Sequence, residues 1–502
     1  MKYNSKWKNV FYRKKITGAE PGGTDRAGRT AYMSECLPRA ANGADASVID
    51  DAKRLHLVGI GGVSMCALAE ALAAGGHTVT GSDISGGRGV ERLRAGGISV
   101  TVGHGAALIA EAAPGAVIRS AAIDDLNPEI MAAREAGIPV ISRAQAWVRL
   151  MRRYERVLCV AGTHGKTTTT GMAAHIALEA GLDPSVMLGG ELPPIDAGHR
   201  IGGGNLMVFE ACEYRDSFLS FMPTVAVILN IELDHLDYFR DLDHILDSFA
   251  RFAALTPGGG AVVANGGDRN VAECLRRIPP NVKDRRVIRF GTRPDCDVRL
   301  VAAPDMGAPI EIYAGGRLYA AAALKAPGAH NAMNAAAAAA AAYALGIPGA
   351  AVSRGLESFT GARRRFERLG HYNGAEVVDD YAHHPTEVAV TIETARGMGY
   401  KRVLCAFQPH TYTRTAALFD DFAAALAAAD KLYVAEIYAA RERPTGLSAA
   451  KLAGAVPRAE FFAGLDELRD ALARDAMPGD LILTMGAGDI ERVGRELAAA
   501  GD

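Results

Sequence analysis

The chain has 502 residues, of which 49% are hydrophobic and 22% are charged, with a formal net charge of −2 at pH 7. This length exceeds what one compact core usually holds and predicts about three domains. The composition is typical of a soluble globular protein, and the near-neutral charge excludes a general attraction to nucleic acid or acidic membranes. No stretch offers the ~20 uninterrupted apolar residues of a membrane span. We therefore expect small-molecule substrates, no nucleic-acid partner and no membrane insertion.

Residues 1–50 differ from the remainder of the chain, because they are basic, carry few acids and show little periodicity. They contain no apolar core of a secretory signal. We expect a disordered tail without function, and Met33 is an alternative start of translation. The seven cysteines are scattered and form no C-x-x-C pair, which favours a reducing cytoplasm over a disulfide framework or a zinc site.

The first globular segment, residues 51–153, alternates strand-like and helix-like patterns. Leu55 to Ile60 is a predicted strand, a glycine turn follows, and Met65 to Ala74 is a predicted helix. This order predicts a parallel, doubly wound sheet. The turn Gly59-Ile60-Gly61-Gly62-Val63-Ser64, with Asp83 further on, resembles a dinucleotide fingerprint whose third glycine is replaced by Ser64. From the residues alone, NAD and any other diphosphate-bearing nucleotide fit equally well.

The second segment, residues 154–360, begins with Val157 to Thr170, VLCVAGTHGKTTTT. A β-branched run, a glycine turn, a lysine and a helical pattern from Met172 to Ala180 predict a strand, a phosphate loop and a helix. Lys166 would reach the β- and γ-phosphates, and the hydroxyl of Thr167 would bind Mg²⁺. The loop is shorter than the strict motif, since Val160 stands where the first glycine would be. An ordinary strand-to-helix turn is the alternative.

Three further groups of polar residues accompany this loop. Glu210-Ala-Cys-Glu213 and Asn230 to Asp237 each follow a predicted strand, so their carboxylates, with His235, are candidate magnesium ligands. His330, Asn331 and Asn334 open an alanine-rich predicted helix, where they either cap it or bind an adenine edge. Arg363 to Arg365 lie at the next boundary, either as a solvated face or as contacts to a γ-phosphate.

The third segment, residues 361–502, repeats the α/β pattern and has two polar loops after strands. Asp379 to Glu387 read DDYAHHPTE, and Gln408 to Thr415 read QPHTYTRT. Both loops should lie on one edge of a sheet, where they would form a pocket for an anionic, amine-bearing small molecule.

The motifs GTHGKTTTT, NIELDHLDYF, APGAHNAMNA, RRRFE, DDYAHHPTE, FQPHTYTRT and MGAGDI together resemble those of the bacterial Mur ligase family over about residues 53–495. The resemblance implies an α/β protein of three domains: an N-terminal Rossmann-like domain, a central P-loop ATP-binding domain and a C-terminal Rossmann-like domain. It is greatest to members that use ATP and Mg²⁺ to join L-alanine to the carboxylate of UDP-N-acetylmuramate through an acyl phosphate. A UDP-sugar substrate decides against NAD as the ligand of the Gly59–Ser64 turn. A sibling activity that attaches a peptide or another amino acid is the alternative, and a non-catalytic nucleotide-binding scaffold is a weaker one. A cytoplasmic monomer or homodimer is expected.

The resemblance also implies roles for individual residues. The expected UDP-sugar contacts are Gly59, Gly61, Gly62, Ser64, Ser82, Asp83 and His104. The expected ATP contacts are Gly162, Thr163, His164, Gly165, Lys166, Thr167, Thr168, His330, Asn331, Asn334 and Arg364. The expected metal ligands are Thr167, Glu213 and His235, the amino-acid pocket is Tyr381, His383, His410 and Arg414, and the catalytic set is Lys166, His383, Arg414 and Asp380. Cys212, Ala382 and Thr411 depart from the usual family residues, which affects the amino-acid contacts more than the reaction. Because the reacting groups come from three segments, domain closure is expected.

Overall fold

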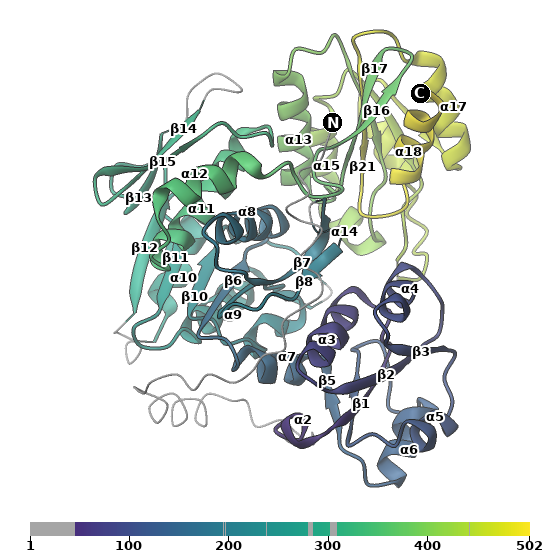
Figure 1. Cartoon of the computed structure of the whole chain (residues 1–502). Helices are drawn as coiled ribbons and strands as arrows, with labels where there is room; N and C mark the ends of the chain where they lie inside the picture. The colour runs from purple at the N-terminus through teal and green to yellow at the C-terminus, as the bar shows by residue number, and fades with distance from the viewer. Residues whose placement is uncertain are drawn as a thin grey trace.

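The computed structural model describes residues 46–501 except 194, 196, 237, 280–284, 302–308 and 441. Most of the predicted N-terminal tail lies outside the described residues. Its last part forms the short helix α2 (Val48–Asp51), whose Ile49 is buried in the first core. Three sheets, each with helices on its faces, follow one another along the chain (Figure 1).

The first sheet has five parallel strands in the order β3-β2-β1-β4-β5. Its strands are β1 (Arg54–Val58), β2 (Thr78–Asp83), β3 (Ser99–Val102), β4 (Ala116–Arg119) and β5 (Val140–Ser142). Its helices are α3 (Val63–Ala74), α4 (Arg88–Ala95), α5 (Ala107–Ala112), α6 (Pro128–Glu135) and α7 (Arg143–Met151). The strand order reverses at β1, so the carboxyl end of β1 is the place where such a sheet binds ligands.

The central sheet has ten strands in the order β15-β14-β13-β12-β11-β10-β6-β9-β7-β8. The strands are β6 (Arg156–Ala161), β7 (Ser185–Leu192), β8 (Ala197–Arg200), β9 (Leu206–Glu210), β10 (Val225–Ile228), β11 (Ala261–Asn265), β12 (Arg286–Gly291), β13 (Val298–Val301), β14 (Ile310–Ala314) and β15 (Arg317–Ala322). Parallel pairing runs from β13 to β7, whereas β8, β14 and β15 pair antiparallel at the two edges.

The helices of the central domain are α8 (Lys166–Glu179), the 3₁₀ segment η2 (Tyr214–Ser220), α9 (Leu242–Ala254), α10 (Arg269–Arg277), α11 (Ala329–Ala344) and α12 (Gly349–Ser358). Helix α11 packs against α8 and β12, and its eight alanines from Ala335 to Ala342 are all buried. Small side chains allow this close approach, which holds the start of α11 beside the start of α8.

The third sheet has six strands in the order β16-β17-β21-β18-β19-β20, with only β16 antiparallel. Its strands are β16 (Glu367–Tyr372), β17 (Ala375–Asp380), β18 (Val403–Phe407), β19 (Lys431–Ala435), β20 (Ala459–Phe462) and β21 (Leu481–Met485). Its helices are α13 (Pro385–Gly397), α14 (Tyr412–Ala417), α15 (Phe419–Leu426), α16 (Ala449–Ala455), α17 (Leu465–Asp475) and α18 (Glu491–Gly501).

The predicted fold class, three α/β domains with mostly parallel sheets, is confirmed. The predicted helix after the phosphate loop was placed too late, since α8 begins at Lys166 rather than Met172. Its threonines are therefore helical, and all four are buried. The edge strands β8, β16 and β20 were not predicted. The domain ranges 51–153, 154–360 and 361–502 stay predictions, and the three sheets span residues 54–142, 156–322 and 367–485. Among the described residues, no helix is long and apolar enough to cross a membrane.

Candidate active site

The phosphate loop, residues Gly162–Thr168, joins the buried end of β6 to the first turn of α8. Gly162 has φ +150° and Gly165 has φ +81°, and the latter caps α8. Both conformations favour glycine, and a Cβ on Gly165 would lie 2.5 Å from Oδ1 of Asn334. The first backbone N–H groups of a helix have no partner within the helix and attract anions. The loop therefore has a geometry that suits a phosphate group, and phosphate binding by its residues stays a prediction.

Lys166 is held inside this loop by three acceptors. Its Nζ donates to the carbonyls of Gly162 (2.6 Å) and Thr163 (3.0 Å) and to the Glu213 carboxylate (3.1 Å). Burial lowers the pKa of Lys166, but the Glu213 charge outweighs this effect and raises it above its usual value. Burial likewise raises the pKa of Glu213, and Lys166 and His235 bring it below its usual value. Both groups are thus charged, and the lysine is positioned for an incoming phosphate.

Two of the three expected metal ligands, Glu213 and His235, lie close together, and Lys166, the residue before Thr167, contacts Glu213. Nε2 of His235 lies 3.5 Å from Oε1 of Glu213, and His235 adopts a left-handed backbone, φ +54°, that turns its ring toward that carboxylate. Thr167 is buried at the first turn of α8, one residue from Lys166. Hydroxyl and carboxylate oxygens suit Mg²⁺, and the imidazole is the unusual member. The donor set fits one magnesium ion beside the phosphate loop.

The expected adenine residues lie at the start of α11. Asn331 donates to the carbonyl of Pro327 (2.6 Å), and Asn334 donates to Asn331 (3.1 Å). Burial lowers the pKa of His330 to about 4, so its ring is neutral at pH 7. These side chains border the phosphate loop through Asn334, next to Gly165.

A cleft of about 1270 Å³ opens where the three domains meet. Residues of all three domains line it, including most of the expected UDP-sugar and amino-acid contacts. These are Gly59, Gly61, Gly62, Ser64, Asp83 and His104 from the first domain, His235 from the second, and Tyr381, His383, His410 and Arg414 from the third. Segments as far apart in sequence as Gly59 and Ala487 therefore share one cavity.

Three expected contacts are engaged elsewhere. Ser82 is fully buried, donates its hydroxyl to Glu129 (2.8 Å) and does not line the cleft, so its role as a ligand contact stays a prediction. Arg364 donates to Asp379 (3.1 Å) and to two carbonyls just after β21, which gives it a structural role here, and its contact to ATP stays a prediction. Asp380 accepts the backbone N–H groups of Phe366 and Ala382 at 2.8 and 2.7 Å. Burial raises its pKa to about 6, and its carboxylate organises the loop without lining the cleft.

The two loops of the third domain meet at His383 and His410. Nδ1 of His383 donates to the carbonyl of Tyr381 (2.9 Å), and its ring lies 6.0 Å from that of His410. Burial lowers the pKa of each histidine to about 4. Both rings are therefore neutral near pH 7, and Nε2 of His383 carries a lone pair.

Arg414 connects this loop to the central domain. It donates to Oδ1 of Asp234 through Nη2 (2.8 Å) and Nε (3.1 Å), and both side chains are nearly buried. Burial raises the pKa of Asp234, but Arg414 and the nearby histidines bring it well below its usual range. Arg414 is thus the expected cation at the cleft, held by an acid whose role the sequence did not reveal.

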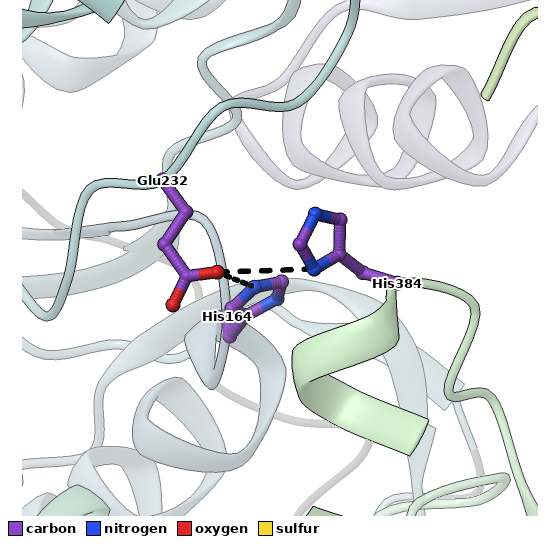
Figure 2. Close-up of side chains that lie close together, drawn as sticks. All are labelled: His164, Glu232 and His384. Atoms are coloured by element: carbon purple, nitrogen blue, oxygen red, sulfur yellow. Dashed lines mark hydrogen bonds and ion pairs between the residues drawn. The ribbon is translucent and has the colours of Figure 1, made fainter. Parts of the chain in front are cut away.

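A second contact between these domains surrounds His164 of the phosphate loop. Its Nε2 lies 3.4 Å from Glu232, and its Nδ1 lies 3.1 Å from Glu387 of α13. Figure 2 shows Glu232 reaching both His164 and His384, whose Nδ1 is 3.8 Å away. Burial lowers the pKa of His164, but the two carboxylates raise it to about 9. A charged imidazole therefore links the central domain to the third.

These three side chains have metal-ligand chemistry, but the atoms that face one another already have hydrogen-bond or ion-pair partners. Thr386 donates its hydroxyl to Glu232 (2.7 Å) and its backbone N–H to Nδ1 of His384 (3.4 Å). The positive end of α13 also faces this point, which disfavours a cation. The cluster is an interdomain contact that the sequence did not predict, because its members come from three separate motifs.

Three family domains match the chain in sequence order. "Mur ligase family, catalytic domain" matches residues 54–155, "Mur ligase middle domain" matches residues 160–342, and "Mur ligase, glutamate ligase domain" matches residues 364–488. Together they cover most of the three sheets, and the gap between the first two matches falls at the start of β6.

Individual proteins resemble the chain over nearly their whole length. The UDP-N-acetylmuramate–L-alanine ligase of Clostridium novyi is 40% identical over 451 residues, 89% of this chain and 97% of that protein. That of Caldanaerobacter subterraneus is 41% identical over 88% of this chain and 97% of its own. The crystal structure of a UDP-N-acetylmuramate–alanine ligase from Thermotoga maritima is 30% identical, with a TM-score of 0.72 over 89% of this chain and 98% of that one. The phosphate loop, the three-domain cleft and these likenesses together place the chain in the Mur ligase family.

Proposed function

We propose that the protein joins L-alanine to the carboxylate of UDP-N-acetylmuramate with consumption of ATP, a step in making peptidoglycan precursors. The relatives that share about 40% of its residues carry that activity in their names. The observation that carries the proposal is the cleft lined by a diphosphate-type glycine turn, by Asp234 and His235 of the central domain and by the third domain's histidine loops. A ligase needs these three parts together, since it must hold a carboxylate, a phosphate and an amine in line.

In the first half-reaction the sugar carboxylate would attack the γ-phosphate of ATP to give an acyl phosphate and ADP. The N-terminus of α8 and Lys166 would hold the triphosphate, and His330, Asn331 and Asn334 would contact adenine. Thr167, Glu213 and His235 would hold Mg²⁺, which when bound neutralises charge on the phosphates. The Glu213 carboxylate keeps Lys166 charged and directed into the loop at 3.1 Å.

In the second half-reaction the amine of alanine would attack the acyl carbon, and phosphate would leave. His383 is the candidate base for the amine proton, because it is neutral and its Nε2 lone pair is unused by the bond to Tyr381. Arg414 would face the developing negative charge from the wall of the cleft. Asp380 supports this loop through backbone hydrogen bonds.

The glycine turn Gly59–Ser64 would receive the diphosphate, and Asp83 the ribose. Ser64 is fixed there by the indole of Trp147, which donates to its hydroxyl at 3.0 Å. We further propose that the reaction takes place in the cytoplasm, the compartment that fits scattered free thiols. The expected monomer or homodimer stays a prediction.

Attachment of a ready-made peptide is the second candidate. The murein peptide ligase of Psychrobacter arcticus has a TM-score of 0.67 and 26% identity to this chain over 89% of it. Against this candidate, Tyr381 stands in the cleft with the guanidinium of Arg365 5.1 Å from its ring centre. A ring so held would limit the size of the acceptor to a small amino acid.

The experiment uses UDP-N-acetylmuramate with oxygen-18 in its carboxylate and measures whether the label appears in the released phosphate. Activation as an acyl phosphate transfers one labelled oxygen to the released phosphate, and mass spectrometry would detect it together with the alanyl product. Product formation without label in phosphate would contradict the acyl-phosphate route. Absence of product, with ATP, Mg²⁺ and L-alanine all present, would contradict the function itself.

A further inference from the structure

A buried carboxylate in the first domain has no part in the chemistry described so far. Glu129, in the first turn of α6, is fully buried and accepts hydrogen bonds from three side chains. They are Nε2 of His56 (2.7 Å), the hydroxyl of Ser82 (2.8 Å) and Nδ1 of His104 (2.7 Å). Burial raises the pKa of Glu129, but these bonds bring it below its usual value, so the group is ionised.

An ionised carboxylate accepts hydrogen bonds and donates none, which determines where the histidine hydrogens lie. His56 uses both nitrogens inside the cluster, because its Nδ1 also contacts the hydroxyl of Thr80 at 2.8 Å. His104 must place its hydrogen on Nδ1, toward Glu129. In this tautomer Nε2 of His104 carries a lone pair. Among the described residues, the hydrogen bonds of His104 are made by Nδ1, and Nε2 has no partner.

The position of His104 in the sheet indicates which part of a nucleotide it meets. In a sheet of this topology the diphosphate lies at the turn after the first strand and the ribose at the acid that ends the second. Here those places are Gly59–Gly62 after β1 and Asp83 at the end of β2, and β3 is the next strand outward. His104 follows β3, lines the cleft and keeps 15% of its side chain exposed. The base is therefore the part of the ligand beside His104.

We propose that Glu129 is a positioning residue that makes His104 select uracil. With its hydrogen held on Nδ1, His104 presents Nε2 as an acceptor for the N3–H of uracil. Cytosine has an acceptor at N3 and would meet the same lone pair without a hydrogen between them. A site that forms a hydrogen bond with the N3–H of uracil therefore rejects cytosine, which lacks that donor. This inference rests on the proposed function, which puts a uridine nucleotide in the first domain.

The test compares binding of UDP and CDP to the full-length protein by calorimetry, since the two differ only in the base. We expect UDP to bind at least about 10-fold more tightly, the effect of one unsatisfied polar group. Glu129→Gln and His104→Phe should each lower the ratio of the two affinities by about 10-fold. Glu135→Gln, an exposed change on the same helix, is the matched control and should leave the ratio unchanged.

Nitrogen-15 NMR of the histidine rings supplies a readout that a loss of packing would not mimic. In the unchanged protein without ligand, we expect the hydrogen of His104 to lie on Nδ1. In Glu129→Gln, we expect this hydrogen to move to Nε2 or to exchange between the two nitrogens. Hydrogen on Nε2 of His104 in the unchanged protein would overturn the inference, as would a UDP-to-CDP ratio that His104→Phe does not change. If the enzyme ligates alanine but shows no base preference, only this inference fails. If neither nucleotide binds, the proposed function fails with it.

Discussion

Replacing His164 by glutamine removes the charge that joins the phosphate loop to the third domain. In the folded protein this imidazole lies between Glu232 and Glu387, 3.4 and 3.1 Å away, and the ring of His384 lies 4.9 Å from it at an interplanar angle of 43°. Arg365 is the other cation near Glu387, at 3.7 Å. His164→Gln keeps a polar side chain of similar size but leaves both carboxylates without their shared partner.

The size of the effect follows from the pKa. Folding raises the pKa of His164 from 6.5 to about 9, and each unit corresponds to about 1.4 kcal/mol. The stabilisation is therefore about 3 kcal/mol, to order of magnitude. Because the folded pKa is the higher one, the contribution is complete below pH 6.5 and disappears as the pH rises through 9.

Urea unfolding of the wild-type and His164→Gln proteins at pH 6 and pH 10 measures this contribution. The variant should be less stable at pH 6, and the difference between the two proteins should nearly vanish at pH 10. His371→Gln, which replaces an exposed imidazole on β16, is the control for the loss of a histidine. A stability difference that stays constant across this range would refute the reasoning, because it would show that no proton at position 164 is linked to folding.

Three other changes test the site. Lys166→Met should lower kcat by about 10²- to 10³-fold and leave UDP binding intact, because it removes a contact to a charged transition state. Turnover near the wild-type rate would exclude the phosphate-loop assignment. Tyr381→Ala should reduce the preference for L-alanine over larger amino acids in kcat/KM, and unchanged selectivity would show that this ring does not limit the pocket. Asp234→Asn should weaken the contact between the central and third domains, since it leaves Arg414 without its carboxylate in a nearly buried place, a loss of about 3–5 kcal/mol for a broken buried pair. Solution scattering should then give a larger radius of gyration, and identical curves for variant and wild type would mean that this ion pair does not hold the domains together.

The phosphate loop, the central helix α11 and the parallel sheets were predictable from the sequence because each depends on local pattern. A glycine turn between a β-branched run and a helix needs no distant partner to be recognised. The start of α8 was missed because threonine is a poor helix former in isolation, whereas here all four threonines are buried in the domain core.

Residues assigned by adjacency were less predictable. Ser82 and Asp83 are neighbours on β2, but successive side chains of a strand point to opposite faces, so Asp83 lines the cleft and Ser82 is buried. The three consecutive arginines likewise diverge, with Arg363 donating to Glu191 and Arg364 to Asp379. Glu129 gave no signal, because an acid in the first turn of a helix is common for its dipole alone. Only the tertiary fold brings it to His56 and His104.

Phosphate release with ATP, Mg²⁺ and UDP-N-acetylmuramate, measured with L-alanine, glycine, L-serine, L-glutamate or a tripeptide, distinguishes the alanine ligase from its alternatives in one assay. The account predicts release that depends on all three substrates and is fastest with L-alanine. Release with the tripeptide alone would contradict it and indicate a peptide ligase, and release with none of the acceptors would contradict the ligase assignment.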